Sequence, residues 1–288
     1  MPRFTYIRPQ TLDETLHLLA QPQKRSRLLA GGTDLMIRLR YAAPDFDRII
    51  DISRLPELKI IAREEDSIHI GASVTYTEIL ESALLQDLTP FFVAAARQIA
   101  GPQIRNQGSI GGNIVNAAGG ADMLPPLVCL DATVQLASKQ GQRSLLLTDF
   151  IEQPHRTRIR PEEVLTRIIF PAPQPETNAV FIKLGRQRTK AISRITIAAM
   201  GRTDARGRIS FMRFVPGAIA PRVQRFTAVE ELLLGELPLP ELFRQAGEEA
   251  VRVMNALTGG RWSSDYKIPA LRTLTQRALA AIFSLQSI

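Results

Sequence analysis

Short apolar runs separated by polar turns open the chain and predict alternating helices and strands. A capping-box signature at residues 11–14 precedes leucines at helical spacing, so the first element is expected to be a helix. Residues 27–30 and 49–52 have the apolar pattern of short buried strands, and residues 34–38 between them have helical character. With the glycine-bearing turn after residue 30, this order of strand, turn, helix and strand predicts an α/β opening.

The middle of the chain favours antiparallel strands and short helices. Residues 58–61 and 67–70 predict a hairpin around a polar turn. A second capping box at residues 75–78 predicts a helix that runs toward residue 85, and Pro90 opens an alanine-rich helix that reaches residue 99. Further strands are expected at residues 133–137, 143–147 and 164–170.

Three prolines at alternating positions in residues 171–175 give the clearest linker signal, and a domain boundary is expected near Pro173. Beyond it, an antiparallel meander is predicted at residues 180–184, 195–201 and 209–214. The tail is expected to be helical at residues 228–234, 241–257 and 268–283.

Composition then narrows the class of protein. Hydrophobic residues make up 45% and charged residues 22%, which is ordinary for a globular protein. No apolar run is long enough for a membrane span, and the N-terminal residues lack the pattern of a signal peptide. A single cysteine, Cys129, excludes an internal disulfide and any cysteine-held cluster. We therefore expect a reduced, cytoplasmic location.

The net charge of +8 admits nucleic-acid binding, an acidic partner or an anionic cofactor. The basic residues are dispersed, although residues 156–160 and 183–190 are richer in them, and no aromatic platform is interleaved. Nucleic acid is therefore not an expected partner. The plainest interpretation of the charge is a solvated basic face.

Two glycine loops carry the clearest chemistry. Residues 30–34, directly after a predicted strand, contain Gly31 and Gly32, whose missing side chains let backbone N–H groups reach a phosphate. Residues 109–113, within the longer segment 101–116, combine a serine, two glycines and an asparagine. The backbone N–H groups that Gly111 and Gly112 leave free are expected to converge with those of the first loop on one diphosphate. Neither loop is a Rossmann G-x-G-x-x-G or a Walker A sequence, so a dinucleotide held without a Rossmann fold is the interpretation that remains.

Other catalytic chemistry lacks a signature. The three histidines, His17, His69 and His155, are far apart and lack metal-ligand spacing. No G-x-S-x-G nucleophile sequence is present, and Cys129 lies in an apolar run where a small buried side chain is expected. We expect no catalytic residue and no metal site in this chain.

Both loops also identify a family by resemblance. Residues 29–35, 103–106, 109–113 and 121–122 resemble the FAD-binding (medium) subunit of molybdenum hydroxylases, the group of xanthine dehydrogenase, carbon monoxide dehydrogenase and nicotinate dehydrogenase. Residues 264–267 resemble the short stretch before that family's last helix. The resemblance covers nearly the whole chain, and the two loops together are specific.

The resemblance implies an α+β fold with two domains. A two-lobed vanillyl-alcohol-oxidase-type (PCMH-type) FAD-binding domain would cover residues 1–173, with lobes at about 1–55 and 56–173. A smaller C-terminal flavoprotein domain with a three-stranded antiparallel sheet and helices would cover residues 174–288.

The resemblance also implies the contacts of one FAD. The residues that match the family's cofactor positions are Leu28, Leu29, Ala30, Gly31, Gly32, Thr33, Asp34, Ile99, Ala100, Gly108, Ser109, Gly112, Asn113, Val115, Asn116, Asp122, Leu165 and Lys183. Plainer roles stay open, with Asp122 as a helix cap, Leu165 as core and Lys183 as a solvated strand residue. For Asn116, the plainer role is to complete a turn without contacting the cofactor. Because neither loop contains histidine or cysteine, the FAD is expected to be bound non-covalently.

Function follows from the same resemblance. In the family, a molybdopterin-containing large subunit hydroxylates the substrate, and 2Fe-2S clusters on a small subunit pass electrons to FAD. The FAD subunit then delivers them to NAD or another acceptor, so a cytoplasmic heterotrimer and an oxidoreductase role are expected. Positive charge from Lys183, Arg186 or Arg188 near the flavin would favour its reduced form. The alternatives are a self-sufficient FAD-dependent reductase on the same fold and a non-redox protein that binds anions or nucleic acid.

Overall fold

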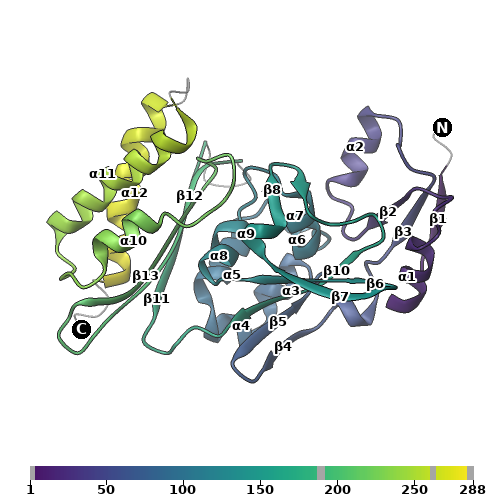
Figure 1. Cartoon of the computed structure of the whole chain (residues 1–288), viewed down its shortest axis with the longest axis horizontal. Coiled ribbons are helices and arrows are strands. Elements are labelled where there is room, and N and C mark those ends of the chain that lie inside the picture. Colours follow the sequence, from purple (N-terminus) through teal and green to yellow (C-terminus); the bar gives the residue numbers. More distant parts are fainter. Residues whose placement is uncertain (1–3, 187–191, 260–263, 284–288) are drawn as a thin grey trace. The chain divides into compact units, whose positions relative to one another are not determined.

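The chain divides into two compact units in the computed structural model, which describes residues 4–186, 192–259 and 264–283 (Figure 1). The first unit consists of Met1–Gln86, Ala100–Ala117 and Asp131–Ala172. The second unit consists of Asp87–Ile99, Ala118–Leu130 and Pro173–Ile288. The chain thus passes into the second unit twice before the proline-rich segment, which the linker signal alone does not predict.

A small parallel sheet opens the first unit. Its strands are β1 (Thr5–Ile7), β3 (Arg48–Asp51) and β2 (Ser26–Leu29), in that order across the sheet. The connecting helices are α1 (Leu12–Leu19) and α2 (Leu35–Tyr41). Thr11 caps α1 by accepting from the Glu14 N–H, as the sequence predicts, but the Glu14 carboxylate accepts from the Gln10 N–H outside the helix. The capping box is therefore only half formed.

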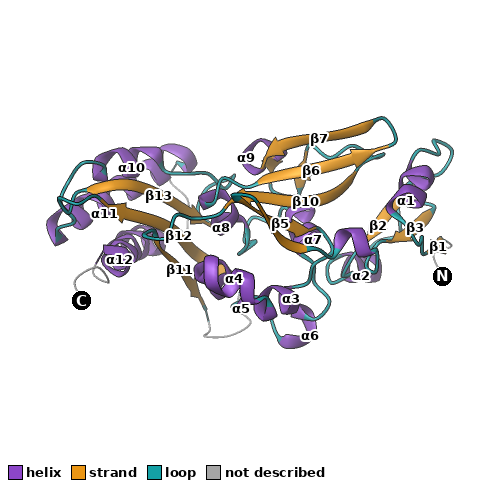
Figure 2. Ribbon diagram, turned by 90° about the horizontal axis from the view of Figure 1, so that it is seen from below, coloured by secondary structure: helices purple, strands orange, loops and turns teal. Residues whose placement is uncertain are grey.

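A five-stranded antiparallel sheet forms the rest of the first unit's framework, and Figure 2 shows its strands side by side. In spatial order the strands are β4 (Ile61–Glu64), β5 (Ser67–Gly71), β10 (Val164–Pro171), β6 (Thr133–Ser138) and β7 (Gly141–Leu146). The first hairpin strand begins later than expected, because Pro56 starts a 3₁₀ turn at Pro56–Leu58 that buries Leu58 completely. Val164 packs with Ile50 and Leu19, so both sheets share one core.

Short helices connect these strands. They are α3 (Tyr76–Glu81), α4 (Ala83–Leu88), α6 (Pro102–Arg105), α7 (Ile110–Asn116) and α9 (Leu147–Phe150), and a small hairpin pairs β8 (Ile151–Gln153) with β9 (Arg156–Thr157). The single helix predicted toward residue 85 is instead two helices, because the extended backbone of Ser82 (ψ 110°) ends α3. The capping box that starts α3 at Thr75 is fully formed.

The second unit contains the predicted meander. The strands β11 (Asn178–Gly185), β12 (Ser193–Thr203) and β13 (Ile209–Gly217) form a three-stranded antiparallel sheet. Its helices are α5 (Pro90–Arg97), α8 (Leu124–Cys129), α10 (Thr227–Leu233), α11 (Pro240–Thr258) and α12 (Ser264–Phe283). The segment 264–267, expected before the last helix, forms the first turn of α12. The mixed helix and strand content confirms the predicted α+β class.

Alternation along the strands gives this sheet two covered faces. Ile195, Ile197 and Ala199 pack in one core with side chains of α10, α11 and α12, which Figure 1 shows on one side of the sheet. Helix α5 contacts β11, and α8 contacts β12 and β13. Cys129 at the end of α8 is fully buried, which confirms the expected small apolar role. No described helix is long and apolar enough to cross a membrane.

Candidate functional site

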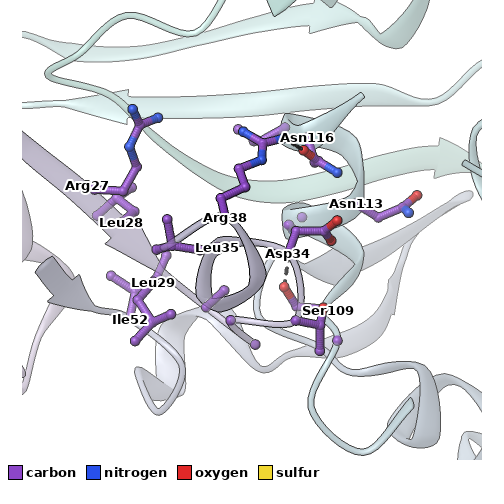
Figure 3. Close-up of a pocket in the computed structure, with 18 of the residues that line it drawn as sticks. Arg27, Leu28, Leu29, Asp34, Leu35, Arg38, Ile52, Ser109, Asn113 and Asn116 are labelled. Carbon is purple, nitrogen blue, oxygen red and sulfur yellow. Dashed lines mark hydrogen bonds between the residues drawn. The ribbon is translucent and has the colours of Figure 1, made fainter. Parts of the chain in front are cut away.

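A cavity of about 740 Å³ in the first unit collects both glycine loops (Figure 3). Its volume lies in the range of small-molecule pockets. The predicted residues that line it are Leu28, Leu29, Ala30, Gly31, Gly32, Thr33, Asp34, Gly108, Ser109, Gly112, Asn113, Val115, Asn116 and Leu165. In Figure 3 the apolar side chains of Leu29, Leu35 and Ile52 lie on one side, and polar side chains from both loops lie on the other.

The first loop, residues 30–34, leaves the carboxyl end of β2 and leads into α2. Ligands commonly bind at the carboxyl edge of a parallel sheet, because the strand ends leave a crevice there. No described residue accepts a hydrogen bond from the backbone N–H of Gly31, Gly32, Thr33 or Asp34. Unpaired backbone donors are rare in native proteins. Here they line a cavity, where an anionic ligand would satisfy them.

The second loop, residues 108–113, is satisfied internally. The N–H groups of Ile110 and Gly111 donate to Val74 O and Ala72 O, both at 2.9 Å. The Gly112 N–H donates to Ser109 Oγ at 3.1 Å, and the Asn113 N–H to Ser109 O at 3.1 Å. The expectation that glycines in this loop free backbone amides for a phosphate is therefore wrong for residues 111–112. The polar group that the second loop offers to a ligand is instead the side chain of Asn113, whose Oδ1 is buried without a hydrogen-bond partner.

The two loops touch where both lack side chains. A Cβ on Gly31 would lie 1.9 Å from Gln107 O and 2.9 Å from the Cα of Gly108, so only glycine permits this approach. Gly32 has a φ of +71°, in the left-handed region that glycine adopts without strain. The sequence prediction that the loops converge is correct, because residues of both loops line the same cavity.

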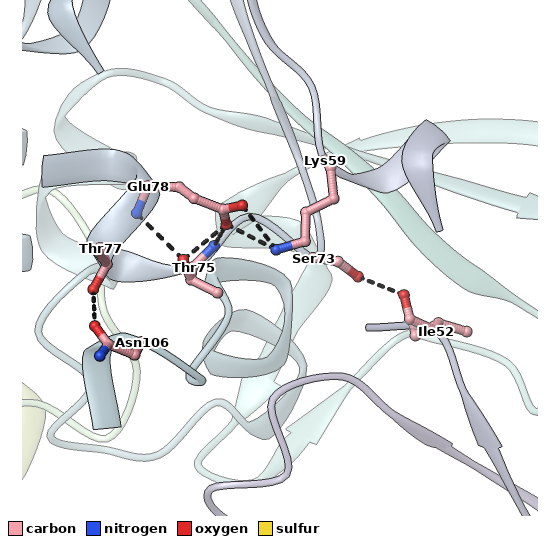
Figure 4. A network of polar contacts seen from close by, with 7 residues as sticks. All are labelled: Ile52, Lys59, Ser73, Thr75, Thr77, Glu78 and Asn106. Atoms are coloured by element: carbon pink, nitrogen blue, oxygen red, sulfur yellow. Dashed lines mark hydrogen bonds and ion pairs between the residues drawn. The ribbon is translucent and has the colours of Figure 1, made fainter. Parts of the chain in front are cut away.

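A polar network behind the second loop holds it in place (Figure 4). Glu78 accepts from the Thr75 N–H at 2.6 Å and pairs with Lys59 at 2.8 Å. The adjoining Tyr76 N–H donates to Gly108 O at 3.2 Å, and Thr75 forms a β-bridge with Ser109. Burial raises the pKa of Glu78, but hydrogen bonds from Lys59 and Thr75 outweigh it and hold that pKa below its ordinary value. An ionised Glu78 thus fixes the start of α3 against the loop.

Several cavity residues were not predicted from the sequence. They are Arg27, Leu35, Arg38, Leu39, Ala42, Ala43, Pro44, Asp45, Phe46, Ile52, Ala72, Tyr76, His155, Arg156, Thr157 and Ile159. His155 has a φ of +62° in the β8–β9 turn, its N–H donates to Ala117 O at 2.9 Å, and its Nδ1 lies 3.1 Å from Asn116 O. Arg38 could have been predicted from the helical period of α2, because it lies one turn after Asp34 and therefore on the same face of the helix.

Four predicted residues do not line this cavity. Ala100 belongs to the first unit, and its carbonyl accepts from Arg105 NH1 at 3.1 Å. Ile99, Asp122 and Lys183 belong to the second unit. There Lys183 Nζ lies 2.6 Å from Asp122 Oδ2 and 3.0 Å from Gln98 O, and Ser193 Oγ donates to Asp122 Oδ1.

This pair changes the interpretation of both side chains. Asp122 and Lys183 are each 9% exposed, so Lys183 is neither solvated nor an unbalanced positive charge. Asp122 makes no helix cap, because α8 has Met123 at its N-cap position without a side-chain hydrogen bond. Arg188, also considered as a positive group, lies outside the described residues.

The cavity suits a dinucleotide better than a metal or an acid–base reaction. Within the described ranges, no three His, Cys, Asp or Glu side chains gather to hold a metal. The free N–H groups of the first loop match the oxygens of a diphosphate, and the orphaned Asn113 Oδ1 matches a sugar or ribityl hydroxyl. Leu29, Leu165 and Ile52 supply apolar surface for rings. The residues present therefore fit FAD.

Comparisons with known proteins give matches along most of the chain. Residues 2–173 match the family described as FAD binding domain in molybdopterin dehydrogenase, and residues 180–282 match the CO dehydrogenase flavoprotein C-terminal domain. A xanthine dehydrogenase FAD-binding subunit of Escherichia coli O157:H7 is 32% identical over 96% of this chain and 94% of its own length. The nicotinate dehydrogenase FAD-subunit of Eubacterium barkeri is 35% identical over 82% of this chain and 81% of its own.

A solved structure extends the likeness to the fold. Carbon monoxide dehydrogenase from Hydrogenophaga pseudoflava, in a form that lacks the Mo-pyranopterin moiety, superposes with a TM-score of 0.90 at 31% identity. The match covers 98% of this chain and 98% of that one. The two-domain FAD-binding fold expected from the sequence is thereby confirmed.

Proposed function

Because the chain belongs to the family of FAD-binding subunits of molybdenum hydroxylases, we propose that it carries one non-covalent FAD in the first unit's cavity and transfers electrons. The FAD takes electrons from 2Fe-2S clusters of a partner subunit and passes them to NAD or another acceptor. The observation that carries the proposal is the run of unpaired N–H donors at residues 31–34, set against the second loop.

Each wall of the cavity has a part in this binding. The first loop donates hydrogen bonds to the diphosphate, Asn113 accepts from a hydroxyl of the ligand, and Leu29 and Leu165 exclude water from its rings. Bound FAD supplies reversible uptake of electrons. The chain's own residues orient it. Because the chain has one cysteine, buried in α8, the iron–sulfur clusters belong to a small partner subunit. Membership of the family assigns the molybdopterin to a large partner subunit.

The first experiment is purification of the chain alone, followed by a flavin absorption spectrum and chromatography of the released cofactor. We expect one FAD per chain, released by denaturation because it is not covalently bound. A colourless protein that takes up no added FAD would contradict the proposal and favour an anion- or nucleic-acid-binding role.

A second experiment tests the assembly. The chain is co-expressed with its neighbouring reading frames, of which one is expected to be cysteine-rich and one to be long enough for a molybdopterin subunit. In the purified complex, substrate should reduce the FAD only when both partners are present. If the isolated chain turns over a substrate by itself, the self-sufficient reductase would be correct instead.

A further inference from the structure

Three arginines among the described residues line the cavity, and two of them are neutralised. Arg27 Nη2 lies 3.4 Å from Asp45 Oδ2, and Arg156 Nε lies 2.8 Å from Glu152 Oε2. Arg38 makes no ion pair with any described residue, and its Nη2 donates to the neutral Asn116 Oδ1. Among the cavity's arginines in the described ranges, Arg38 is therefore the one whose charge no carboxylate offsets.

The guanidinium of Arg38 is held in position from the opposite side of the cavity. Arg38 lies on α2, one turn beyond the first loop, and Figure 3 shows its side chain extending to Asn116 at the end of α7. Asn116 is itself anchored, since its carbonyl lies 3.1 Å from His155 Nδ1 in the β8–β9 turn. The charge is thus fixed between two helices that each begin at a glycine loop.

The position of Arg38 on α2 relates it to the unpaired donors. Long side chains on a helix lean toward its N-terminus, and α2 begins directly after the N–H groups of residues 31–34. The Asp34 carboxylate, on the preceding turn, makes no ion pair with Arg38. One guanidinium N–H is used by Asn116, and the others remain to donate charge-assisted bonds.

We propose that Arg38 is the cation that binds the phosphates of the dinucleotide, and that Asn116 positions its guanidinium. This inference rests on the proposed function and adds a specific residue to it. The phosphates would then be held by two kinds of donor, the fixed backbone N–H groups of the first loop and one charged fork from α2.

The test compares apoprotein variants that differ at one arginine each. Arg38→Gln should weaken binding of FAD, and of ADP as a probe that lacks the flavin, by about ten- to a hundredfold, the loss of one charge-assisted hydrogen bond. Arg40→Gln is the matched control, because Arg40 is exposed on the same helix and does not line the cavity. Arg156→Gln should cost about threefold or less, since that arginine is already paired and exposed.

Two further variants test charge and position separately. Arg38→Lys keeps the charge and should regain part of the lost affinity. Asn116→Asp keeps the size of the side chain but gives Arg38 an anionic partner, so it should weaken both ligands about tenfold. Added NaCl should shrink the difference between the wild type and Arg38→Gln, because salt screens the attraction. Thermal unfolding of the Arg38 and Arg40 variants as apoproteins should match the wild type, since α2 contains no buried residue.

The outcomes separate this inference from the proposed function. If the wild type binds FAD but Arg38→Gln binds FAD and ADP as tightly as Arg40→Gln does, the role of Arg38 is wrong while the FAD site stands. If Arg38→Gln loses FAD but keeps ADP, Arg38 acts on the flavin half and the inference fails as well. If the wild type binds no FAD, the proposed function fails.

Discussion

The two glycine loops line one cavity but are built in opposite ways. In the first loop, no described residue accepts from the N–H groups of residues 31–34, and α2 behind it contains no buried residue. In the second loop, the N–H groups of residues 110–113 all have acceptors within the fold, and α7 buries Ile110, Gly111 and Ile114. Similar sequences therefore give one donating loop and one supporting loop.

The difference shows that a backbone donor serves either the fold or a ligand. The second loop gives its N–H groups to acceptors within the fold and gains a fixed position against the segment between β5 and α3. The first loop keeps its donors for a ligand and has little packing of its own. Gly31 instead lies directly against Gly108 of the second loop and against Gln107, the residue before it. The supporting loop thus determines where the donating loop stands.

The largest expected effect comes from forcing the two loops apart. Gly31→Ala places a Cβ 1.9 Å from Gln107 O, and because α2 is not packed into a core, the first loop should move away. Loss of two charge-assisted hydrogen bonds would weaken FAD binding about a hundredfold or more. Titration of the apoprotein with FAD measures this. The apoprotein's urea midpoint should change little.

Gly111→Ala is the converse experiment in the second loop. The added Cβ would lie 2.6 Å from both the Cβ and the carbonyl oxygen of Ala72, within the buried core. Overpacking of this kind costs about 1–3 kcal/mol of unfolding free energy. Urea unfolding of the apoprotein should show the loss. If Gly31→Ala and Gly111→Ala gave the same balance of lost stability and lost affinity, the division of roles between the loops would be wrong.

Local patterns predicted the elements well where neighbours in sequence decide the structure. Alternation predicted the meander of β11, β12 and β13, and the capping box at Thr75 predicted the start of α3. The passage of α5 and α8 into the second unit was missed, because it depends on packing against strands far along the chain. Composition marks a linker at residues 171–175 but does not reveal which earlier helices cover the sheet beyond it.

Only the part of the site that depends on glycine positions could be predicted from the sequence. The absence of a side chain at Gly31 indicates that another segment of the chain lies very close to it. The structure shows that this segment is the backbone of Gln107. Which N–H groups stay free is decided by acceptors such as Ala72 and Val74, which no motif includes. The partner of Lys183 was equally hidden, since Asp122 lies 61 positions away and only the folded second unit brings the two together.

A smaller effect is expected at the helix caps. Ser109→Ala removes the acceptor of the Gly112 N–H, and loss of such a cap costs about 1 kcal/mol. Asp34→Ala is the matched control in the other loop, because Asp34 makes no side-chain hydrogen bond to α2 and its loss should leave stability nearly unchanged. Urea unfolding of both apoproteins compares them. Equal losses would mean that the first loop is as tightly built as the second.

The smallest effect concerns the charge that supports the second loop. Because hydrogen bonds hold the pKa of Glu78 below its ordinary value, its ionised form stabilises the fold at neutral pH. That stabilisation is complete above the ordinary carboxyl pKa and is lost as the pH falls through the depressed one. Glu78 is partly exposed, so Glu78→Gln should lower the free energy of unfolding by less than about 1 kcal/mol at pH 7.

The pH dependence separates this charge effect from a change in packing. The stability gap between the wild type and Glu78→Gln should shrink between pH 7 and about pH 3.5, since acid removes the wild type's charge and the amide has none to lose. Glu81→Gln, exposed on the same helix, is the control and should show no such change. Urea unfolding at both pH values measures the gap. A gap of constant size would mean that the Glu78 side chain supports the second loop through its shape and neutral hydrogen bonds, because a depressed carboxyl pKa necessarily makes stability depend on pH.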